Sequence, residues 1–336
     1  MKIGEFDLEK KVLVIAEIGN NHEGDPAIAS ELVRQAADCG VDAVKFQTFR
    51  AEHYVSKSDT PRFNRLKSFQ LSYSQFEKLS QLAHSLGVLF ISTPFDMASA
   101  EFLEGIVDAY KIASGDNNFY PLLGRIAETH KPVIVSTGLS EFSDVQRTVS
   151  FLKKYMSESE YHDRLAILHC VSSYPVPAEQ ANLRSIQFLA ENFDCHIGYS
   201  DHTIGLDAAV LAVALGARII EKHFTLDKNF SDFRDHQISS DPSDLRELVR
   251  RIRDATLMLG ERNKSLQPCE LTSREAMRRS IVAGADLSAG HCISGSDLTW
   301  VRPGGGLAPG EEHALIGKRL VHAVRFGDQL NSSDVK

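Results

Sequence analysis

Residues 12–19 read VLVIAEIG, a run of mostly branched apolar residues with a glutamate near its end. Runs of the same kind return up to Phe224: VDAVKFQ (41–47), VLFIST (88–93), VDAYKIAS (107–114), PVIVST (132–137), LAILHC (165–170), CHIGYS (195–200) and ARIIEKHF (217–224). They are rich in Val and Ile and lack polar alternation, which is typical of strands buried on both faces of a parallel sheet.

The segments between these runs carry helix signals. Asp25 and Pro26 would begin one helix and Gly40 would end it, and Ser74 with Glu77 forms a capping-box pattern before the next. Eight strand–helix units in one domain predict a (β/α)8 TIM barrel. The alternative is a doubly wound open sheet, which would usually show a GxGxxG turn after the first strand, and that motif is absent.

The residue composition of the chain changes after Gly260. Residues 263–275 are polar and contain Pro268, which predicts a linker, and from Arg278 onward the chain is glycine-rich with short strand-like runs. We therefore expect a TIM-barrel catalytic domain at residues 1–262, a linker at 263–275 and a small, mostly β domain at 276–336. A domain of that size has marginal stability by itself, so we expect it to pack against a larger surface.

Composition excludes several functional classes. The net charge is −8, so the chain lacks the concentrated basic face of a nucleic-acid-binding protein. The five cysteines are scattered without a CxxC pair, which disfavours a disulfide framework and favours a reducing, cytoplasmic setting. The first residues, MKIGEFDLEK, do not resemble a signal peptide, and no apolar run approaches the ~20 residues of a membrane span.

Polar side chains gather where the predicted strands end, and in a TIM barrel the active site lies at the C-terminal ends of the strands. In chain order they are Glu17, Asn20 and His22; Lys45 and Gln47; Thr93; Lys111 and Ser114; Ser136 and Thr137; His169, Ser172 and Tyr174; Ser200, Asp201 and His202; and Lys222 and His223. Buried polar groups are costly unless they are paired or used, so this coincidence predicts one ligand-binding mouth.

Two lysines and two histidines in this set suggest specific chemistry. Lys45 and Lys111, with the nearby hydroxyls, could hold a phosphate as point charges, although either could instead form a salt bridge with Glu17 or another barrel carboxylate. His202 and His223 end neighbouring strands, so their imidazoles can converge on a divalent metal, or serve only as hydrogen-bonding groups. His22 and His169 are weaker candidates of the same kind.

Three carboxylates and one loop complete the candidate site. Glu17, Asp116 and Asp235 could recognise sugar hydroxyls or move protons, or they could be structural ion pairs. The polar loop at residues 49–69 follows the second strand and would lie on the active-site face, where it could act as a lid or be a plain surface insertion.

The chain resembles the sialic acid synthase family, which includes N-acetylneuraminate, N-acylneuraminate-9-phosphate, legionaminate, pseudaminate and spore coat polysaccharide synthases. The resemblance runs from about Val12 to the C-terminus and rests on several motifs in order. They are AEIGNNHEG (16–24), VKFQTF (44–49), STPFD (92–96), YKIASGD (110–116), STG (136–138), GYSDHT (198–203), EKHFTLD (221–227), RRSI (278–281) and VRPGGG (301–306). The tail resembles the antifreeze-like (SAF-type) domain of that family.

The resemblance implies a transferase that condenses phosphoenolpyruvate with an N-acylmannosamine-type aldehyde, free or 6-phosphorylated, to give a sialic-acid-like nonulosonic acid and phosphate. It assigns phosphoenolpyruvate binding to Lys45, Thr93, Lys111, Ser114, Ser136 and Ser200. It assigns a manganese or magnesium ion to His202 and His223, which with Glu17 would be catalytic. Sugar binding falls to Gln47, Asp116, Tyr174, Asp235 and Arg302, with Arg302 reaching the other subunit's site in a domain-swapped homodimer.

Two departures from the family pattern bear on the acceptor. Asp116 stands where many bacterial members carry glutamate, and GDNNFYPLL (115–123) resembles the animal branch, which uses a 6-phosphorylated sugar. Phe233 and Arg234 precede Asp235, where a Gly-Pro or Gly-Ser pair is common. We hypothesise that Arg234 favours a phosphorylated or acidic acceptor; the alternative is that it is a solvated loop residue.

Two other functions fit parts of the sequence. One is a different phosphoenolpyruvate-dependent aldose synthase, which would share the barrel, lysines and metal but not the antifreeze-like tail. The other is a non-catalytic carbohydrate-binding or coat protein that kept the fold. The presence of four candidate site residues argues against this function: Lys45, Lys111, His202 and His223.

Overall fold

The computed structural model describes residues 1–336 and divides them into two compact units, Met1–Gly260 and Glu261–Lys336. The five cysteines are free thiols. None of the helices combines the length and the apolar character needed to cross a membrane.

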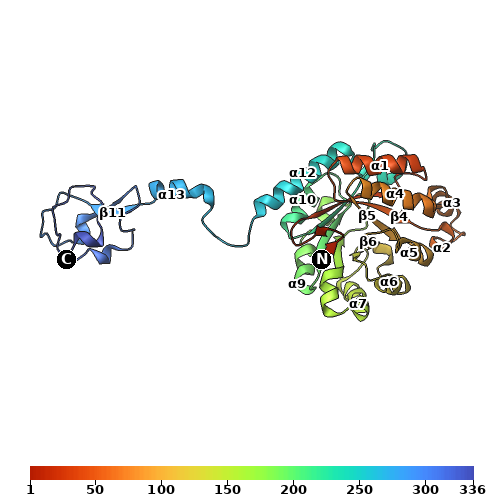
Figure 1. Ribbon diagram of the computed structural model, residues 1–336, viewed down its shortest axis with the longest axis horizontal. Coiled ribbons are helices and arrows are strands. Elements are labelled where there is room, and N and C mark those ends of the chain that lie inside the picture. Colours follow the sequence, from red (N-terminus) through yellow and green to blue (C-terminus); the bar gives the residue numbers. More distant parts are fainter. The chain divides into compact units, whose positions relative to one another are not determined.

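The first unit is built on a closed barrel of eight parallel strands, with its helices on the outside (Figure 1). The barrel runs in the order β10-β3-β4-β5-β6-β7-β8-β9. Its strands are β3 (Leu13–Gly19), β4 (Ala43–Thr48), β5 (Leu89–Pro94), β6 (Ala109–Ile112), β7 (Val133–Ser136), β8 (Leu165–Cys170), β9 (His196–Asp201) and β10 (Ile219–His223). Each falls within one residue of an apolar run quoted above, so the predicted TIM barrel is confirmed and the open sheet is excluded.

Helices lie in the connections between the strands and after the last strand, β10. They are α1 (Pro26–Asp38), α2 (Ala51–Tyr54), α3 (Thr60–Phe69), α4 (Tyr73–Ser85), α5 (Met97–Leu103), α6 (Tyr120–Ala127), α7 (Phe142–Leu152), α8 (Glu158–Arg164), α9 (Ser185–Asn192), α10 (Asp207–Ala214), α11 (Arg234–Ile238) and α12 (Pro242–Leu259). Helix α1 begins at the predicted Asp25 cap. Helix α4 corrects a prediction: its capping box is Ser72 with Gln75, two residues before the predicted Ser74 and Glu77.

Alternation along the strands divides the core into two layers. Residues such as Ile15, Ala43, Ile91 and Ala109 fill the barrel interior, and their alternating neighbours, such as Val14, pack against the surrounding helices. Successive side chains of a strand point to opposite faces. The interior positions turn polar toward the strand ends, where Glu17 lies two residues beyond Ile15. The barrel floor is therefore apolar and its mouth polar.

A short hairpin supplies further apolar groups to the interior cluster. Strands β1 (Lys2–Ile3) and β2 (Phe6–Asp7) pair antiparallel, and Met1, Ile3 and Leu8 join the interior core at 3% exposure or less. They meet the first residues of the barrel strands, such as Leu13, so the hairpin fills the end of the barrel opposite the polar mouth.

The second unit is small and mostly without regular structure. Its elements are α13 (Leu271–Met277), most of which lies in the segment expected to be a linker, and the antiparallel pair β11 (Ser280–Ala283) and β12 (Leu298–Val301). Isolated bridges and short 3-10 turns complete it around a core that includes Ile281 and Leu315. The prediction that this part of the chain forms a small, mostly β domain is confirmed.

Candidate active site

A cavity of about 750 Å³ opens at the C-terminal ends of the barrel strands. All but one of the side chains to which the family resemblance assigns a role line it: Glu17, Lys45, Gln47, Thr93, Lys111, Ser114, Asp116, Ser136, Tyr174, Ser200, His202, His223 and Asp235. The remaining one, Arg302, belongs to the second unit. Side chains that are far apart in sequence thus share one space.

Several polar residues at strand ends do not line this cavity. Thr137, Asp201 and Lys222 occupy the alternate positions of their strands and point to the outer layer, where Thr137 donates a hydrogen bond to the Leu168 carbonyl. The expectation that every polar residue at a strand end lines the mouth is therefore wrong for these three, because neighbouring side chains of a strand face opposite ways.

His22 and His169 also lie outside the cavity. His22 Nδ1 accepts a hydrogen bond from the Gly24 backbone, and His169 Nε2 donates one to the Ala181 carbonyl. Burial lowers the pKa of His22 to about 4 and the pKa of His169 below its usual value, so both imidazoles are neutral. Both orient nearby backbone.

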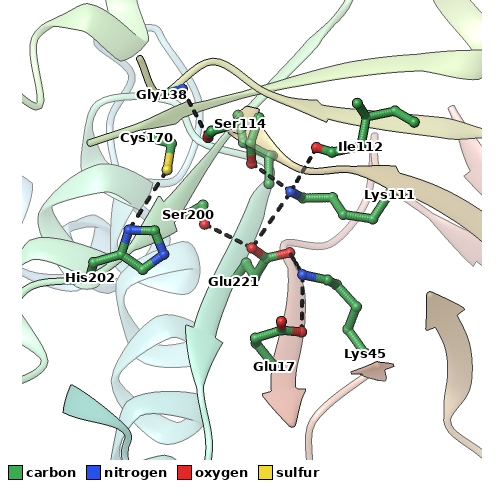
Figure 2. Close-up of polar contacts among 12 residues, drawn as sticks. Glu17, Lys45, Lys111, Ile112, Ser114, Gly138, Cys170, Ser200, His202 and Glu221 are labelled. Carbon is green, nitrogen blue, oxygen red and sulfur yellow. Dashed lines mark hydrogen bonds and ion pairs between the residues drawn. The ribbon is translucent and has the colours of Figure 1, made fainter. Parts of the chain in front are cut away.

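Four charged side chains form a buried network at the base of the cavity (Figure 2). Lys45 Nζ lies 3.0 Å from Glu17 Oε2 and 3.3 Å from Glu221 Oε2, and Lys111 Nζ lies 3.8 Å from Glu221 Oε1. The salt bridge between Lys45 and Glu17, which the sequence left as an alternative to an anion site, is present. It does not remove Lys45 from the cavity, because both lysines and both glutamates line it.

The pKa values of the two glutamates, Glu17 and Glu221, are shifted in opposite directions. Burial raises the pKa of the Glu17 carboxyl despite the opposing effect of Lys45. Burial would raise the pKa of Glu221 as well, but Lys111 and Lys45 outweigh it and lower that pKa to about 2. Two carboxyl groups whose environments separate their pKa values in this way suit an acid/base role for one and a fixed negative charge for the other.

Hydroxyl groups surround the lysine ends. Lys111 Nζ donates to Ser136 Oγ at 2.6 Å, and Ser200 Oγ donates to Glu221 Oε1 at 2.7 Å. The Thr93 hydroxyl is buried without a partner, and Ser114 Oγ accepts from the Gly138 backbone at 3.0 Å. Lysine charges among hydroxyl donors can hold a phosphate or a carboxylate.

Gly138 makes the approach of these hydroxyls possible. A Cβ atom at this position would lie 2.3 Å from Ser172 Oγ and 2.7 Å from Ser114 Oγ. A side chain at this position would force both serine hydroxyls to move from their places in the cavity.

His202 and His223 face each other across the cavity wall, with ring centroids 5.3 Å apart, and Tyr174 lies 4.2 Å from the His202 ring. His202 Nδ1 must donate to the Val171 carbonyl at 2.9 Å, so Nε2 keeps its lone pair. His223 Nδ1 is buried without a hydrogen-bond partner.

The pKa values of the two imidazoles are shifted in opposite directions. Burial, with His202 and Lys45 adding to it, holds the pKa of His223 well below its usual value, so this imidazole is neutral. Burial alone would lower the pKa of His202, but the hydrogen bond with the Cys170 thiol raises it. When His202 is neutral, its Nε2 lone pair and the unpartnered neutral imidazole of His223 fit a divalent cation site with open positions.

The cavity also carries carboxylate and amide groups. Gln47 donates to Glu17 Oε1 at 3.2 Å and accepts from Asn20 Nδ2 at 2.8 Å, so its amide is oriented by two neighbours. Burial raises the pKa of Asp116 to about 6. Burial also raises the pKa of Asp235, against the opposing effect of Arg234.

The 49–69 loop and the segment before α11 form the outer wall. The loop folds into α2 and α3, from which Tyr54, Arg62 and Arg65 line the cavity. From the other side, Arg234 lies over the Tyr174 ring at 5.0 Å with its Nε 3.5 Å from Asp235, and its side chain is 71% exposed. Three guanidinium groups thus stand at the mouth.

Sequence reasoning missed Glu221, Arg62 and Arg65. The signal for Glu221 was available, since it lies two residues before His223 on the same strand and must point the same way. Nothing in the sequence indicated which residues of the long loop turn inward, because a polar loop has no periodicity that fixes a face.

Two family profiles and several curated proteins match this chain. A profile of the NeuB family matches residues 32–264, and a SAF domain profile matches residues 278–336. The chain is 43% identical to an uncharacterized protein of Methanocaldococcus jannaschii, over all of this chain and 98% of that one. It is 41% identical to the N,N'-diacetyllegionaminic acid synthase of Legionella pneumophila, over 94% of this chain and 92% of that one.

A solved structure is similar as well. The N-acetylneuraminic acid (sialic acid) synthetase of Leptospira borgpetersenii, crystallised with citrate, superposes with a TM-score of 0.76 at 34% identity. The match covers 81% of this chain and 94% of that one.

Proposed function

This chain belongs to the NeuB family, as a phosphoenolpyruvate-condensing nonulosonic acid synthase with a C-terminal SAF domain, and from this we propose that its acceptor is an N-acylmannosamine-type aldehyde. The observation that carries the proposal is the meeting, in one cavity, of two lysines, two imidazoles and a glutamate whose pKa is raised. Family membership with a SAF domain sets aside the other aldose synthases and the non-catalytic coat protein.

Phosphoenolpyruvate binds at the lysines in this proposal. Lys45 and Lys111 face the phosphate and carboxylate, with Ser114, Ser136, Ser200 and Thr93 as hydroxyl donors; Thr93 is supported by its unpartnered buried oxygen. Without substrate, the Glu221 carboxylate lies 3.3 Å from Lys45 and 3.8 Å from Lys111 and offsets part of the lysine charge. Charge neutralisation at a buried site of this kind is a large contribution to transition-state stabilisation.

His202 and His223 hold the divalent cation, manganese or magnesium, on which the family depends. Bound there, the cation would draw electron density from the aldehyde oxygen and so favour attack on its carbon. Tyr174 lies against both rings, 4.2 Å from His202 and 6.0 Å from His223, and limits where the acceptor can enter.

Glu17 handles the proton. Carbon 3 of phosphoenolpyruvate forms a bond with the aldehyde carbon, and the raised pKa of Glu17 lets the protonated carboxyl give its proton to the developing alkoxide. Water then adds at carbon 2 and returns a proton to Glu17. The bond from carbon 2 to the phosphate oxygen then breaks as the new hydroxyl group gives its proton to the departing phosphate, which leaves a 2-keto acid and inorganic phosphate.

The acceptor is identified by a phosphate-release screen. Purified full-length protein is incubated with phosphoenolpyruvate, manganese, and either N-acetylmannosamine, its 6-phosphate or a diamino-sugar analogue, and products are identified by mass. We expect acceptor-dependent phosphate release and a product equal in mass to acceptor plus pyruvate. Release with simple aldoses but with none of these sugars would contradict the proposal.

Three further proposals concern assembly and setting. We propose a cytoplasmic, domain-swapped homodimer in which Arg302 reaches the sugar site of the other subunit. The domain boundaries proposed are those predicted from the sequence, at residues 1–262, 263–275 and 276–336. Light scattering at several concentrations, with and without residues 263–336, tests the dimer.

A further inference from the structure

A second group of metal-ligating side chains lies at the opposite end of the barrel from the active site. His196 begins β9, His162 lies in α8, and Glu9 follows the β1–β2 hairpin. One ligand atom from each of the three lies within 4.8 Å of the other two. None of the three lines the active-site cavity.

This group is separate from the catalytic histidines. His196 and His202 are six residues apart along β9 and its end, and an extended strand rises about 3.3 Å per residue. The two imidazoles are therefore at opposite ends of the strand, separated by roughly 20 Å. A cation held at one end cannot serve the other.

His196 is the fixed member of the group. Its side chain is 5% exposed, its Nε2 lies 2.8 Å from Glu9 Oε1, and its Nδ1 is buried without a partner. The Met1 amino nitrogen also lies 3.2 Å from His196 Nε2, so a cation would take the place of this ammonium group.

The other two ligands can adjust. The His162 side chain is 45% exposed and that of Glu9 is 64% exposed, so both can move at little cost. Four-coordinate zinc with bonds of about 2.0–2.1 Å needs ligand atoms roughly 3.4 Å apart. The three ligand atoms lie within 4.8 Å of one another. Small rotations of the Glu9 and His162 side chains can bring them to the spacing that zinc needs.

We propose that Glu9, His162 and His196 form a structural site for a borderline divalent cation such as zinc. Two imidazoles and one carboxylate are a ligand set that suits zinc, cobalt or nickel better than magnesium or calcium. A cation there ties the segment after the hairpin to α8 and to the start of β9. It therefore fastens the hairpin that fills the floor of the barrel.

Zinc titration by calorimetry tests the site in a full-length background that lacks the catalytic imidazoles, His202→Asn with His223→Asn. We expect one equivalent of zinc to bind in this background, and the added change His162→Gln or Glu9→Gln to weaken it at least 10-fold. His84 is the matched control, since it is 47% exposed and lies 2.9 Å from Asp108. His84→Gln should leave zinc binding unchanged.

Thermal unfolding of the chain with native catalytic residues gives a second readout. Zinc should raise the melting temperature of this protein but not that of its His162→Gln variant, while manganese-dependent phosphate release stays the same in both. Zinc binding that survives His162→Gln, or that His84→Gln weakens equally, would show adventitious surface binding and overturn the proposal. Failure of this test leaves the synthase assignment intact, because activity is scored separately.

Discussion

Lys222 Nζ lies 2.8 Å from Asp201 Oδ2, and both side chains are 1% exposed or less. Asp201 directly precedes His202 at the end of β9, and Lys222 directly precedes His223 on the adjacent strand β10. The ion pair lies behind the strands that carry the two imidazoles, and Lys222 also donates to the Thr203 carbonyl. It fixes the two strand ends from which these imidazoles converge.

Removing one partner of this pair should be costly. Lys222→Met leaves the Asp201 carboxylate buried without its counter-charge, for which the expected loss is about 3–5 kcal/mol in the free energy of unfolding. Urea denaturation measures this. The double change Lys222→Met with Asp201→Asn should recover part of the loss, and a single-variant cost below about 1 kcal/mol would show that the pair is not clamping the strands.

Lys111 should matter for substrate and little for stability. Lys111→Met removes one of the two proposed phosphate partners, and we expect kcat/KM for phosphoenolpyruvate to fall about 100- to 1000-fold. Folding should change little, because burial lowers the pKa of Lys111 and Lys45 still lies 3.3 Å from Glu221. The control is Lys131→Met, whose amine bonds the Val107 carbonyl outside the cavity. Equal kinetic losses in both variants would count against the anion site.

Asp116 should give the acceptor KM a pH dependence. Burial raises its pKa to about 6, so its carboxyl is mostly protonated at pH 5 and mostly ionised at pH 7. The ionised form is the stronger acceptor for sugar hydroxyls, so the acceptor KM should fall as pH rises through 6. Asp116→Asn should flatten this part of the profile, and a profile that keeps its slope in the variant would refute the assignment.

The same shift predicts the sign of a stability effect. A carboxyl whose pKa is raised on folding is ionised at a cost, so its contribution to stability is most favourable below its unfolded value near 4 and declines as pH rises through 6. Asp116→Asn should therefore raise the melting temperature at pH 7.5 relative to its effect at pH 4. An equal effect at both pH values would exclude this cause.

Arg234 should set the preference for an anionic acceptor tail. It stands at the mouth with Arg62 and Arg65, and its guanidinium lies over the Tyr174 ring. Arg234→Ala should raise the KM for a 6-phosphorylated acceptor several-fold more than for the free sugar. If the ratio of the two KM values is the same in both proteins, Arg234 is only a solvated loop residue.

The barrel was predictable because each buried strand is a continuous run of apolar residues in the sequence, as in VLVIAEIG. The strand ends were predictable only in part. Polar residues there, such as Lys222 and His223, look alike in the sequence, and only the alternation of side chains separates the outer ion pair from the cavity wall. Applying that alternation to β10 would have identified Glu221.

Residues that the fold brings together from distant segments could not be predicted from a local sequence pattern. Arg62 and Arg65 reach the cavity because the 49–69 loop folds into helices, and Glu9 meets His196 because a hairpin fills the barrel floor. Both depend on contacts between segments far apart in the chain, which no local pattern encodes.

The most direct test of the synthase assignment is the phosphorus NMR relaxation of bound phosphoenolpyruvate in the presence of manganese. If Lys45 and Lys111 hold the substrate beside a cation on His202 and His223, manganese should strongly enhance the relaxation of the bound substrate's phosphorus. The enhancement should fall to the solution background in the His202→Asn/His223→Asn variant. Manganese and phosphoenolpyruvate that bind together without this enhancement would contradict the account.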